Sequence, residues 1–143
     1  IPPIADFLLT DRRLKRLYLH DNVIGDEGAG CLGRALGGNT TLGVLGLEAN
    51  RIGDAGVEAF TKGVAGNQTL YLLDLAHNVG ITDESFHTLE ALLRGSSITY
   101  LETDGTSISM ENRYSLNRLS DILPQERRMC KGISKKAQVG MNT

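Results

Sequence analysis

A repeat of 28 residues constrains the fold of this chain more than any other feature of its sequence. Apolar residues recur at the same places in four successive segments, which begin at Leu14, Leu42, Leu70 and Ile98. The next aligned columns hold Leu17, Leu45, Leu73 and Leu101, and then Leu19, Leu47, Leu75 and Thr103. A unit this short cannot bury its own apolar face, so successive units must stack around one continuous core.

Each unit is expected to contain one short strand followed by one helix. In the strand the side chains alternate, so Leu17 and Leu19 point inward whereas their neighbours point outward. Later in the unit, apolar residues four apart, such as Leu32 and Leu36, predict the buried side of a helix. The fold class we expect is α/β: a solenoid with short parallel strands on its concave side and α-helices on its convex side.

Two polar columns accompany the leucines. Asparagines follow the strands, and their amides can satisfy backbone groups and align as a ladder in stacked units. Aspartates open each helical stretch, where a carboxylate can accept the first free N–H groups as an N-cap. We therefore expect structural roles for Asn22, Asn50, Asn78, Asp26, Asp54 and Asp83.

The pattern LxxLxLxxN, followed by xIGDxG and an LxxxL helix, resembles the ribonuclease-inhibitor-like class of leucine-rich repeats. The resemblance covers about residues 4–108. It implies a eukaryotic protein that binds other proteins through its concave face. Such repeats occur in axonemal regulatory complexes, actin-capping proteins, the Ran GTPase activator and nucleotide-binding immune receptors. The resemblance therefore leaves three interpretations open: a scaffold module in a larger assembly, a GTPase-activating or inhibitory enzyme regulator, and the sensor domain of an immune receptor.

The repeat also divides the chain. Residues 1–13 are expected to form the helix of a preceding, truncated repeat or an N-terminal cap. Repeats follow at 14–41, 42–69 and 70–97, then a degenerate repeat with a capping helix at 98–123, and a basic tail at 124–143. In the capping helix, Met110, Tyr114, Leu119 and Ile122 are predicted to form the buried stripe. Pro124 is predicted to end that helix.

No pattern in the sequence favours catalysis or a bound metal. The three histidines lack metal-binding spacing, and no phosphate-binding loop or nucleophile elbow is present. Two cysteines a hundred residues apart make no disulfide framework, which favours reduced thiols in a cytoplasmic protein. The sequons at Asn39 and Asn67 occupy one column of the repeat, so we interpret them as structural. We expect no cofactor, no metal, no small-molecule substrate and no membrane association.

The outward strand residues predict where a partner binds. They form three rows across the sheet: Arg16, Val44, Leu72, Tyr100; then Tyr18, Gly46, Asp74, Glu102; then His20, Glu48, Ala76, Asp104. An exposed apolar stripe of Val44, Leu72 and Tyr100 is expected beside the acidic residues. A protein segment with apolar anchors and Lys or Arg around them would fit this face. The alternative is that the apolar residues only fill a curved sheet and the acids are solvated.

The C-terminal 20 residues form a second candidate site. They contain five bases and one acid, whereas residues 1–123 contain ten bases and sixteen acids. A polar tail of this kind is expected to be disordered alone and to bind an acidic partner such as tubulin, or to fold back on the acidic body. Because the tail has no aromatic residue, nucleic acid is not the expected partner. These features predict a hetero-complex in the cytoskeleton or the cilium axoneme, with the tail bound through Arg127, Arg128, Lys131, Lys135 and Lys136.

Overall fold

Short strands and helices alternate along the chain. The computed structural model describes the backbone of residues 2–140 and the side chains of residues 3–127. Each strand has three residues, a helix of nine residues precedes the first strand, α-helices of ten to thirteen residues lie between successive strands, and a longer helix follows the last strand. The elements are α1 (Pro2–Thr10), β1 (Arg16–Tyr18), α2 (Asp26–Gly38), β2 (Val44–Gly46), α3 (Asp54–Val64), β3 (Leu72–Asp74), the short 3-10 helix η1 (Asp83–Ser85), α4 (Phe86–Gly95), β4 (Tyr100–Glu102) and α5 (Met110–Gly140).

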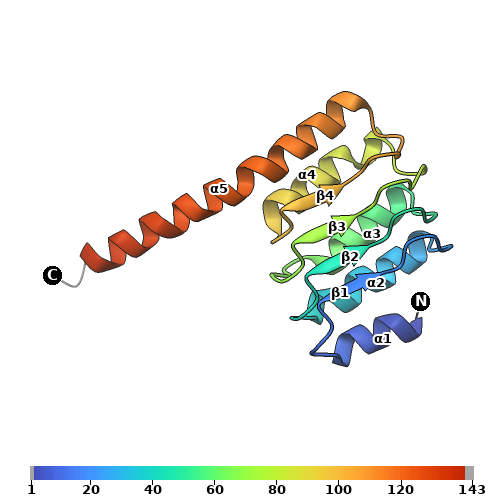
Figure 1. Ribbon diagram of the computed structural model, residues 1–143, viewed down its shortest axis with the longest axis horizontal. Coiled ribbons are helices and arrows are strands. Elements are labelled where there is room, and N and C mark those ends of the chain that lie inside the picture. Colours follow the sequence, from blue (N-terminus) through green and yellow to red (C-terminus); the bar gives the residue numbers. More distant parts are fainter. Residues whose placement is uncertain (1, 141–143) are drawn as a thin grey trace.

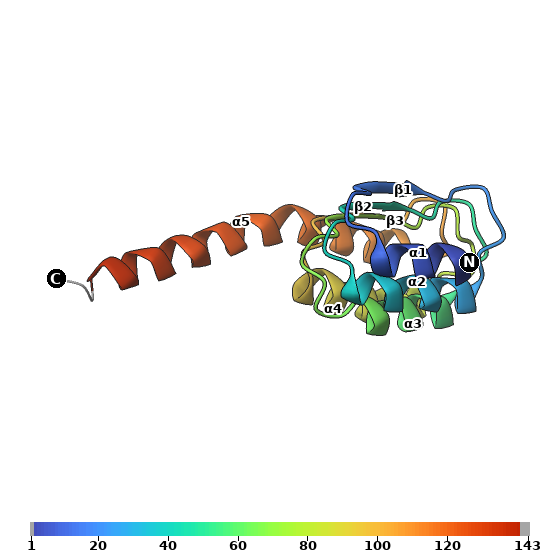
Figure 2. The ribbon, with the colours of Figure 1, turned by 90° about the horizontal axis from the view of Figure 1, so that it is seen from below.

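The four strands form one parallel sheet in chain order, β1-β2-β3-β4 (Figure 1). Residues aligned by the repeat lie side by side, so that Leu17 pairs with Leu45, Leu45 with Leu73, and Leu73 with Leu101. Helices α1 to α4 make a second layer on one side of the sheet (Figure 2). The predicted α/β leucine-rich repeat solenoid is confirmed.

The leucine columns build the core between these two layers. Leu45 and Leu73 are fully buried, as are the helix residues Leu36 and Leu93. In contrast, Leu17 is only half-buried, because β1 is the outermost strand of the sheet. Burying a leucine side chain stabilises the fold by about 1.5–3 kcal/mol, so the stacking of repeats supplies most of the driving force.

Helices α2 and α3 approach each other closely because glycines line their contact. A Cβ atom at Gly33 would lie 2.5 Å from the carbonyl oxygen of Phe60, and a Cβ at Gly63 would collide with the backbone of Arg34. Only glycine fits at these two positions. The pattern of apolar residues does not reveal this requirement.

Asn50 and Asn78 form the expected ladder, whereas Asn22 in the first repeat donates only to the carbonyl oxygens of Leu19 and His20 in its own repeat. The amide nitrogen of Asn78 donates to the carbonyl oxygen of Leu47 in the preceding repeat at 2.9 Å, and to Leu75 in its own repeat at 3.0 Å. Its oxygen Oδ1 accepts the N–H of Ile52 at 3.0 Å. Asn50 makes the equivalent bonds one repeat earlier. Each asparagine therefore joins two repeats through backbone groups that a bend leaves unpaired.

A second ladder uses the two sequon asparagines. The amide of Asn67 donates to the carbonyl oxygens of Leu36 at 2.6 Å and Asn39 at 2.9 Å, and its Oδ1 accepts the N–H of Leu70 at 2.8 Å. Asn39 bonds in the same way to Leu8 and Leu42. The two asparagines are only 4% and 2% exposed. Their role is structural, as their shared column indicates.

The predicted N-cap role of the aspartates is wrong. Gly25 and Gly53 occupy the N-cap positions of α2 and α3, and Asp26 and Asp54 are the first residues inside those helices. From there each carboxylate reaches the following repeat. Asp26 accepts the backbone N–H of Gly53 at 2.7 Å, and Asp83 accepts that of Ser109 at 2.8 Å. The aspartates are a third link between repeats.

Helix α5 departs from expectation in its length. It continues through Pro124 to Gly140, although a proline removes one helical hydrogen bond and costs about 3 kcal/mol in a helix interior. Contacts on both sides of Pro124 hold the helix to the body: Leu123 is buried, and the guanidinium of Arg127 donates to the carbonyl oxygen of Leu93 in α4. The prediction that Pro124 ends the helix is therefore wrong, and residues 125–140 form no separate irregular tail.

The buried stripe of α5 also differs from the predicted one. Met110 and Tyr114 are 80% and 66% exposed, and Ile122 is exposed as well. The residues that face the body are Leu116 and Leu123, with Leu119 half-buried between them. The helix packs beside α4 and the edge strand β4 (Figure 1). In this orientation the predicted stripe, apart from Leu119, faces solvent.

Candidate functional site

The rows of the concave face lie as the repeat predicts, but their exposure is uneven. Arg16, Val44, Leu72 and Tyr100 are neighbours across the sheet, and so are Tyr18, Gly46, Asp74 and Glu102. Tyr18 and Tyr100 are 58% and 59% exposed, whereas Val44 is only 4% exposed and Leu72 is half-buried. The expected exposed stripe that includes Val44 is therefore wrong. The large side chains that are exposed in these rows are two tyrosines, Tyr18 on the first strand and Tyr100 on the last.

Tyr18 lies against the next strand because that strand has a glycine. A Cβ atom at Gly46 would lie 3.0 Å from the ring of Tyr18. Gly46 therefore leaves the space in which the tyrosine ring rests over β2. Tyr100 has no such support, since β4 is the last strand. The two ends of the face thus present tyrosines in different surroundings.

Acidic side chains gather toward the last two strands. Asp74 and Glu102 are half-buried neighbours on β3 and β4, and Asp104 follows in the next turn. Asp74 accepts the N–H of Ala76 at 2.9 Å, and Asp104 pairs with Arg113 of α5 at 3.3 Å. Among the side chains of residues 3–127, Glu102 makes no ion pair. This end of the face therefore has negative charge available to a partner.

The first half of the face is less acidic. Arg16 and His20 are exposed on and beside β1. The carboxylate of Glu48 lies 3.9 Å from the imidazole of His77 in the next repeat. Ala76 is buried and contributes no contact surface. A basic partner would therefore meet its strongest attraction at the C-terminal end of the face.

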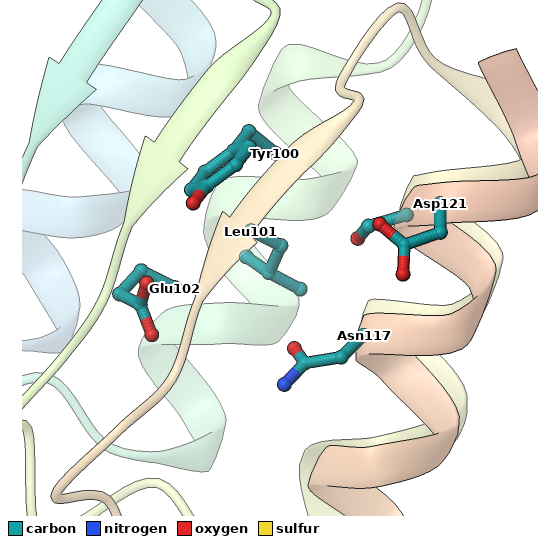
Figure 3. A pocket seen from close by; sticks show the side chains of 6 residues that line it. Tyr100, Leu101, Glu102, Asn117 and Asp121 are labelled. Carbon is teal, nitrogen blue, oxygen red and sulfur yellow. The ribbon is translucent and has the colours of Figure 1, made fainter.

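A pocket adjoins that end. It lies between β4 and α5, has a volume of about 140 Å³, and is lined by Tyr100, Leu101, Glu102, Asn117, Ser120 and Asp121. Figure 3 shows that Asn117 and Asp121 reach from α5 toward the strand. We call these six residues the edge pocket. The sequence alone did not indicate the three residues from α5, because nothing in it places that helix beside β4.

The strand contributes backbone groups to the edge pocket. The N–H of Tyr100 donates to the C=O of Tyr71, and the C=O of Glu102 accepts the N–H of Leu75, so both bond to the residues that flank β3. Because backbone groups of successive strand residues point to opposite sides, the N–H and C=O of Leu101 point away from β3, toward α5. The pocket therefore combines a free strand edge, two carboxylates, an amide, a hydroxyl and an aromatic ring.

Of the predicted basic site, only Arg127 has a described side chain. Its guanidinium bonds to α4 and so serves the attachment of α5 to the body. The side chains of Arg128, Lys131, Lys135 and Lys136 lie outside the described residues, although their backbone belongs to α5.

Three carboxyl groups with altered pKa values belong to the repeat framework. Hydrogen bonds from the N–H groups of Leu14 and Arg13 lower the pKa of Asp11. Burial acts to raise the pKa of Asp54, but hydrogen bonds from Ser85 and Thr82 outweigh it, and the pKa lies below its ordinary value. The N–H of Ser109 and the amide of Asn112 lower the pKa of Asp83. Asp54 and Asp83 are thereby held ionised where they join successive repeats, whereas Asp11 fixes the local turn that leads to Leu14.

Within the part of the chain that the structure describes, no helix has the length and apolar character to span a membrane. The same described part contains no group of three or more His, Cys, Asp or Glu side chains arranged to hold a metal ion.

Comparison with known proteins identifies the repeats. Residues 12–33, 38–60 and 66–85 match the family model described as "Leucine Rich repeat", so these three segments are leucine-rich repeats. No protein with a curated description matches the sequence.

One similar solved structure is that of "Leiomodin-1 Actin-Binding Site 2 (ABS2)". It has a TM-score of 0.73 and 20% sequence identity, and the alignment covers 96% of this chain and 79% of that chain. At this identity the similarity concerns the fold. That solved chain thus shares the architecture described above along nearly the whole length of this one.

Proposed function

We propose that this chain is a non-catalytic protein-binding module that recognises a Lys- or Arg-bearing protein segment on its concave face. The observation that carries the proposal is the C-terminal end of that face, where exposed Tyr100 lies beside Glu102, which has no ion-pair partner among the described side chains. Leucine-rich repeats are scaffolds in which variable strand residues form an extended contact surface.

The chemistry of this end favours a cationic side chain. A Lys or Arg near Tyr100 would gain a cation–π interaction of about 0.5–1 kcal/mol at an exposed site. Carboxylates on the adjacent strand positions add long-range attraction, which increases the association rate more than the affinity. Tyr18 would contribute an apolar contact at the opposite end of the same segment.

The test compares protein capture by matched variants. The purified chain is immobilised, exposed to a cell extract, and its bound proteins are identified by mass spectrometry. The triple variant Glu48→Gln, Asp74→Asn and Glu102→Gln removes charge from the concave face while keeping side-chain shape. The control is Glu58→Gln on α3, whose exposed carboxylate pairs with Lys62 on the convex layer.

We expect the control to retain the specific partners of the original chain and the triple variant to lose them. Circular dichroism and thermal unfolding establish that both variants fold. Capture of the same partners by the folded triple variant would refute recognition through the concave face.

Actin is a specific candidate partner, suggested by the similarity to the leiomodin actin-binding site. Such a partner would agree with a role in a cytoskeletal assembly. Co-sedimentation with actin filaments and gel filtration with monomeric actin test it directly. Binding that the triple variant loses would support the candidate, and no binding to either form would exclude actin without affecting the general proposal.

A further inference from the structure

Half of helix α5 extends beyond the repeats. The last described contact between this helix and the body is the bond from Arg127 to Leu93. The helix then continues to Gly140 and leads away from the sheet and from α1 to α4 (Figures 1 and 2). We call residues 128–140 the distal half of α5, which spans roughly 20 Å at 1.5 Å per residue. A single helix of this length gains little stability in water without a surface to pack on.

The charges of the two parts are opposite. Residues 1–123 have a net charge of −6, and residues 124–143 have a net charge of +4. Four of the five bases in the second segment follow Arg127, namely Arg128, Lys131, Lys135 and Lys136. The chain therefore has an acidic body and a basic projection.

The edge pocket supplies the complementary surface. It has carboxylates from β4 and from α5, Glu102 and Asp121, and neither forms an ion pair among the side chains of residues 3–127. Tyr100 offers its ring, and Asn117 and Ser120 offer oxygen acceptors, to a Lys or Arg that carries only donors. The pocket opens beside the acidic end of the concave face, so it can accept one cation of a segment whose other cations face Asp74 and its neighbours.

The helix cannot bring its own bases to its own pocket. Asn117 and Asp121 lie on the same continuous helix as the distal half, which extends away from them (Figures 1 and 3). From residue 121 to residue 131 the helix rises about 15 Å. A second molecule has no such constraint.

We propose that two copies of this chain associate, with the basic distal half of α5 of one copy bound at the edge pocket and adjoining concave face of the other. This inference rests on the proposed function, since it uses the same preference for a basic segment and names one occupant. The exchange can be reciprocal, because a two-fold axis would give each copy one pocket and one projecting helix in contact. Exposed ion pairs contribute little individually, so the dimer is expected to be weak and to dissociate as salt is added.

The first experiment measures self-association of the full chain by sedimentation velocity over a range of concentrations, at low and at high salt. We expect a monomer–dimer equilibrium at low salt that shifts at least roughly tenfold toward the monomer at high salt. The pocket variant Glu102→Gln with Asp121→Asn should weaken the dimer, and Glu58→Gln should leave it unchanged. A monomer at every concentration at low salt would overturn the proposal, as would a dimer equally strong in the pocket variant.

A charge exchange distinguishes this arrangement from other dimers. One variant carries Glu102→Lys and Asp121→Lys, and the other carries Lys131→Glu and Lys135→Glu. Each alone should be monomeric, because the first variant has a basic pocket and a basic helix, and the second keeps its acidic pocket but has no net positive charge in its distal half. Their mixture should dimerise, because both contacts are complementary again. Failure of the folded variants to associate when mixed would refute the proposed pairing.

The outcome is separate from that of the proposed function. A monomeric chain that still captures other proteins through its concave face would overturn only the dimer. A dimer that follows the charge exchange, in a chain whose capture of other proteins is unaffected by the concave-face variant, would overturn only the recognition of other partners.

Discussion

The carboxylate of Asp54 accepts two hydrogen bonds from Thr82 in the following repeat, one from its backbone N–H at 2.9 Å and one from its hydroxyl at 2.7 Å. Ser85 donates a further bond to the same carboxylate. One side chain at the start of α3 therefore positions the segment that leads into α4. This relationship makes the stacking of repeats dependent on the ionisation of an aspartate.

Asp54→Asn should change how stability depends on pH. The pKa of Asp54 is lowered in the folded chain, so its ionised form contributes stability above its ordinary pKa, and that contribution is lost as the pH falls through the lower folded value. The variant should unfold more easily than the original chain at neutral pH, and the difference should shrink as the pH falls below about 4. Urea unfolding of both proteins across this pH range measures the difference in their free energies of unfolding.

The control for this experiment is Asp6→Asn, which changes an exposed aspartate on α1 that has no hydrogen bond from another repeat among the described residues. Its effect on unfolding should be small. An Asp54→Asn variant whose stability difference stayed constant from neutral to acidic pH would contradict the assigned role of the carboxylate.

Asn67→Ala should destabilise the chain strongly. The substitution removes an amide that bonds to the carbonyl oxygens of Leu36 and Asn39 and accepts the N–H of Leu70. A buried polar group left unpaired costs about 1–3 kcal/mol, and more than one is affected. We expect a loss of about 3 kcal/mol or more in the free energy of unfolding, whereas Gln68→Ala at the exposed neighbouring position should cost little. A loss similar to that of Gln68→Ala would argue against the ladder.

Two glycine substitutions should have opposite effects. A methyl group at Gly63 would collide with the backbone of Arg34, so Gly63→Ala must separate α2 from α3 and should lower the melting temperature. A methyl group at Gly95 meets nothing within 4 Å, so Gly95→Ala should stabilise the chain by about 0.4–1 kcal/mol through the unfolded state. Differential scanning calorimetry of both variants measures the two changes in melting temperature. Equal effects would mean that the helices can separate without cost.

Thr61→Val should stabilise the core. The hydroxyl of Thr61 is buried and has no hydrogen-bond partner among the described residues, and it lies beside a small internal space lined by apolar residues of α3, β3 and α4. Valine has nearly the same shape and removes the unpaired polar atom, which should add about 1 kcal/mol to the free energy of unfolding. Thr61→Ser keeps the hydroxyl and loses a methyl group, so it should destabilise the chain in the same assay. A Val variant no more stable than the original would show that the hydroxyl is satisfied in solution.

Much of the fold could be predicted from the sequence because the same pattern recurs in several repeats, so that each repeat supports the assignment made for the others. The aligned leucine columns predicted both the buried positions and the strand register, and Leu45 and Leu73 are neighbours in the core as expected. The role of the asparagine column could be predicted because an amide at a bend can both donate to and accept from backbone groups that are otherwise unpaired. The aspartate column could not, since a carboxylate at a helix start can bond either to its own helix or to the next repeat.

The surface was less predictable than the core. Val44 belongs to an outward row, yet it is buried, because exposure depends on the size and placement of side chains on neighbouring strands. The edge pocket depends on the docking of α5 beside β4, which buries Leu116 and Leu123 rather than the predicted stripe. A helical pattern indicates that one face of a helix is buried. Because α5 has apolar residues on several faces, the pattern did not identify which of them is buried.

The sequence by itself determined the architecture of this protein, namely repeats of one strand and one helix stacked on leucine and asparagine columns. A repeated local pattern has one way to bury its apolar residues, so no long-range information was needed. The tertiary structure decided where aspartates Asp26, Asp54 and Asp83 bond, how far α5 continues past Pro124, and which groups meet at the edge pocket. These outcomes depend on contacts between residues of different repeats or elements, and the energy of such contacts is set only when the elements are placed in space.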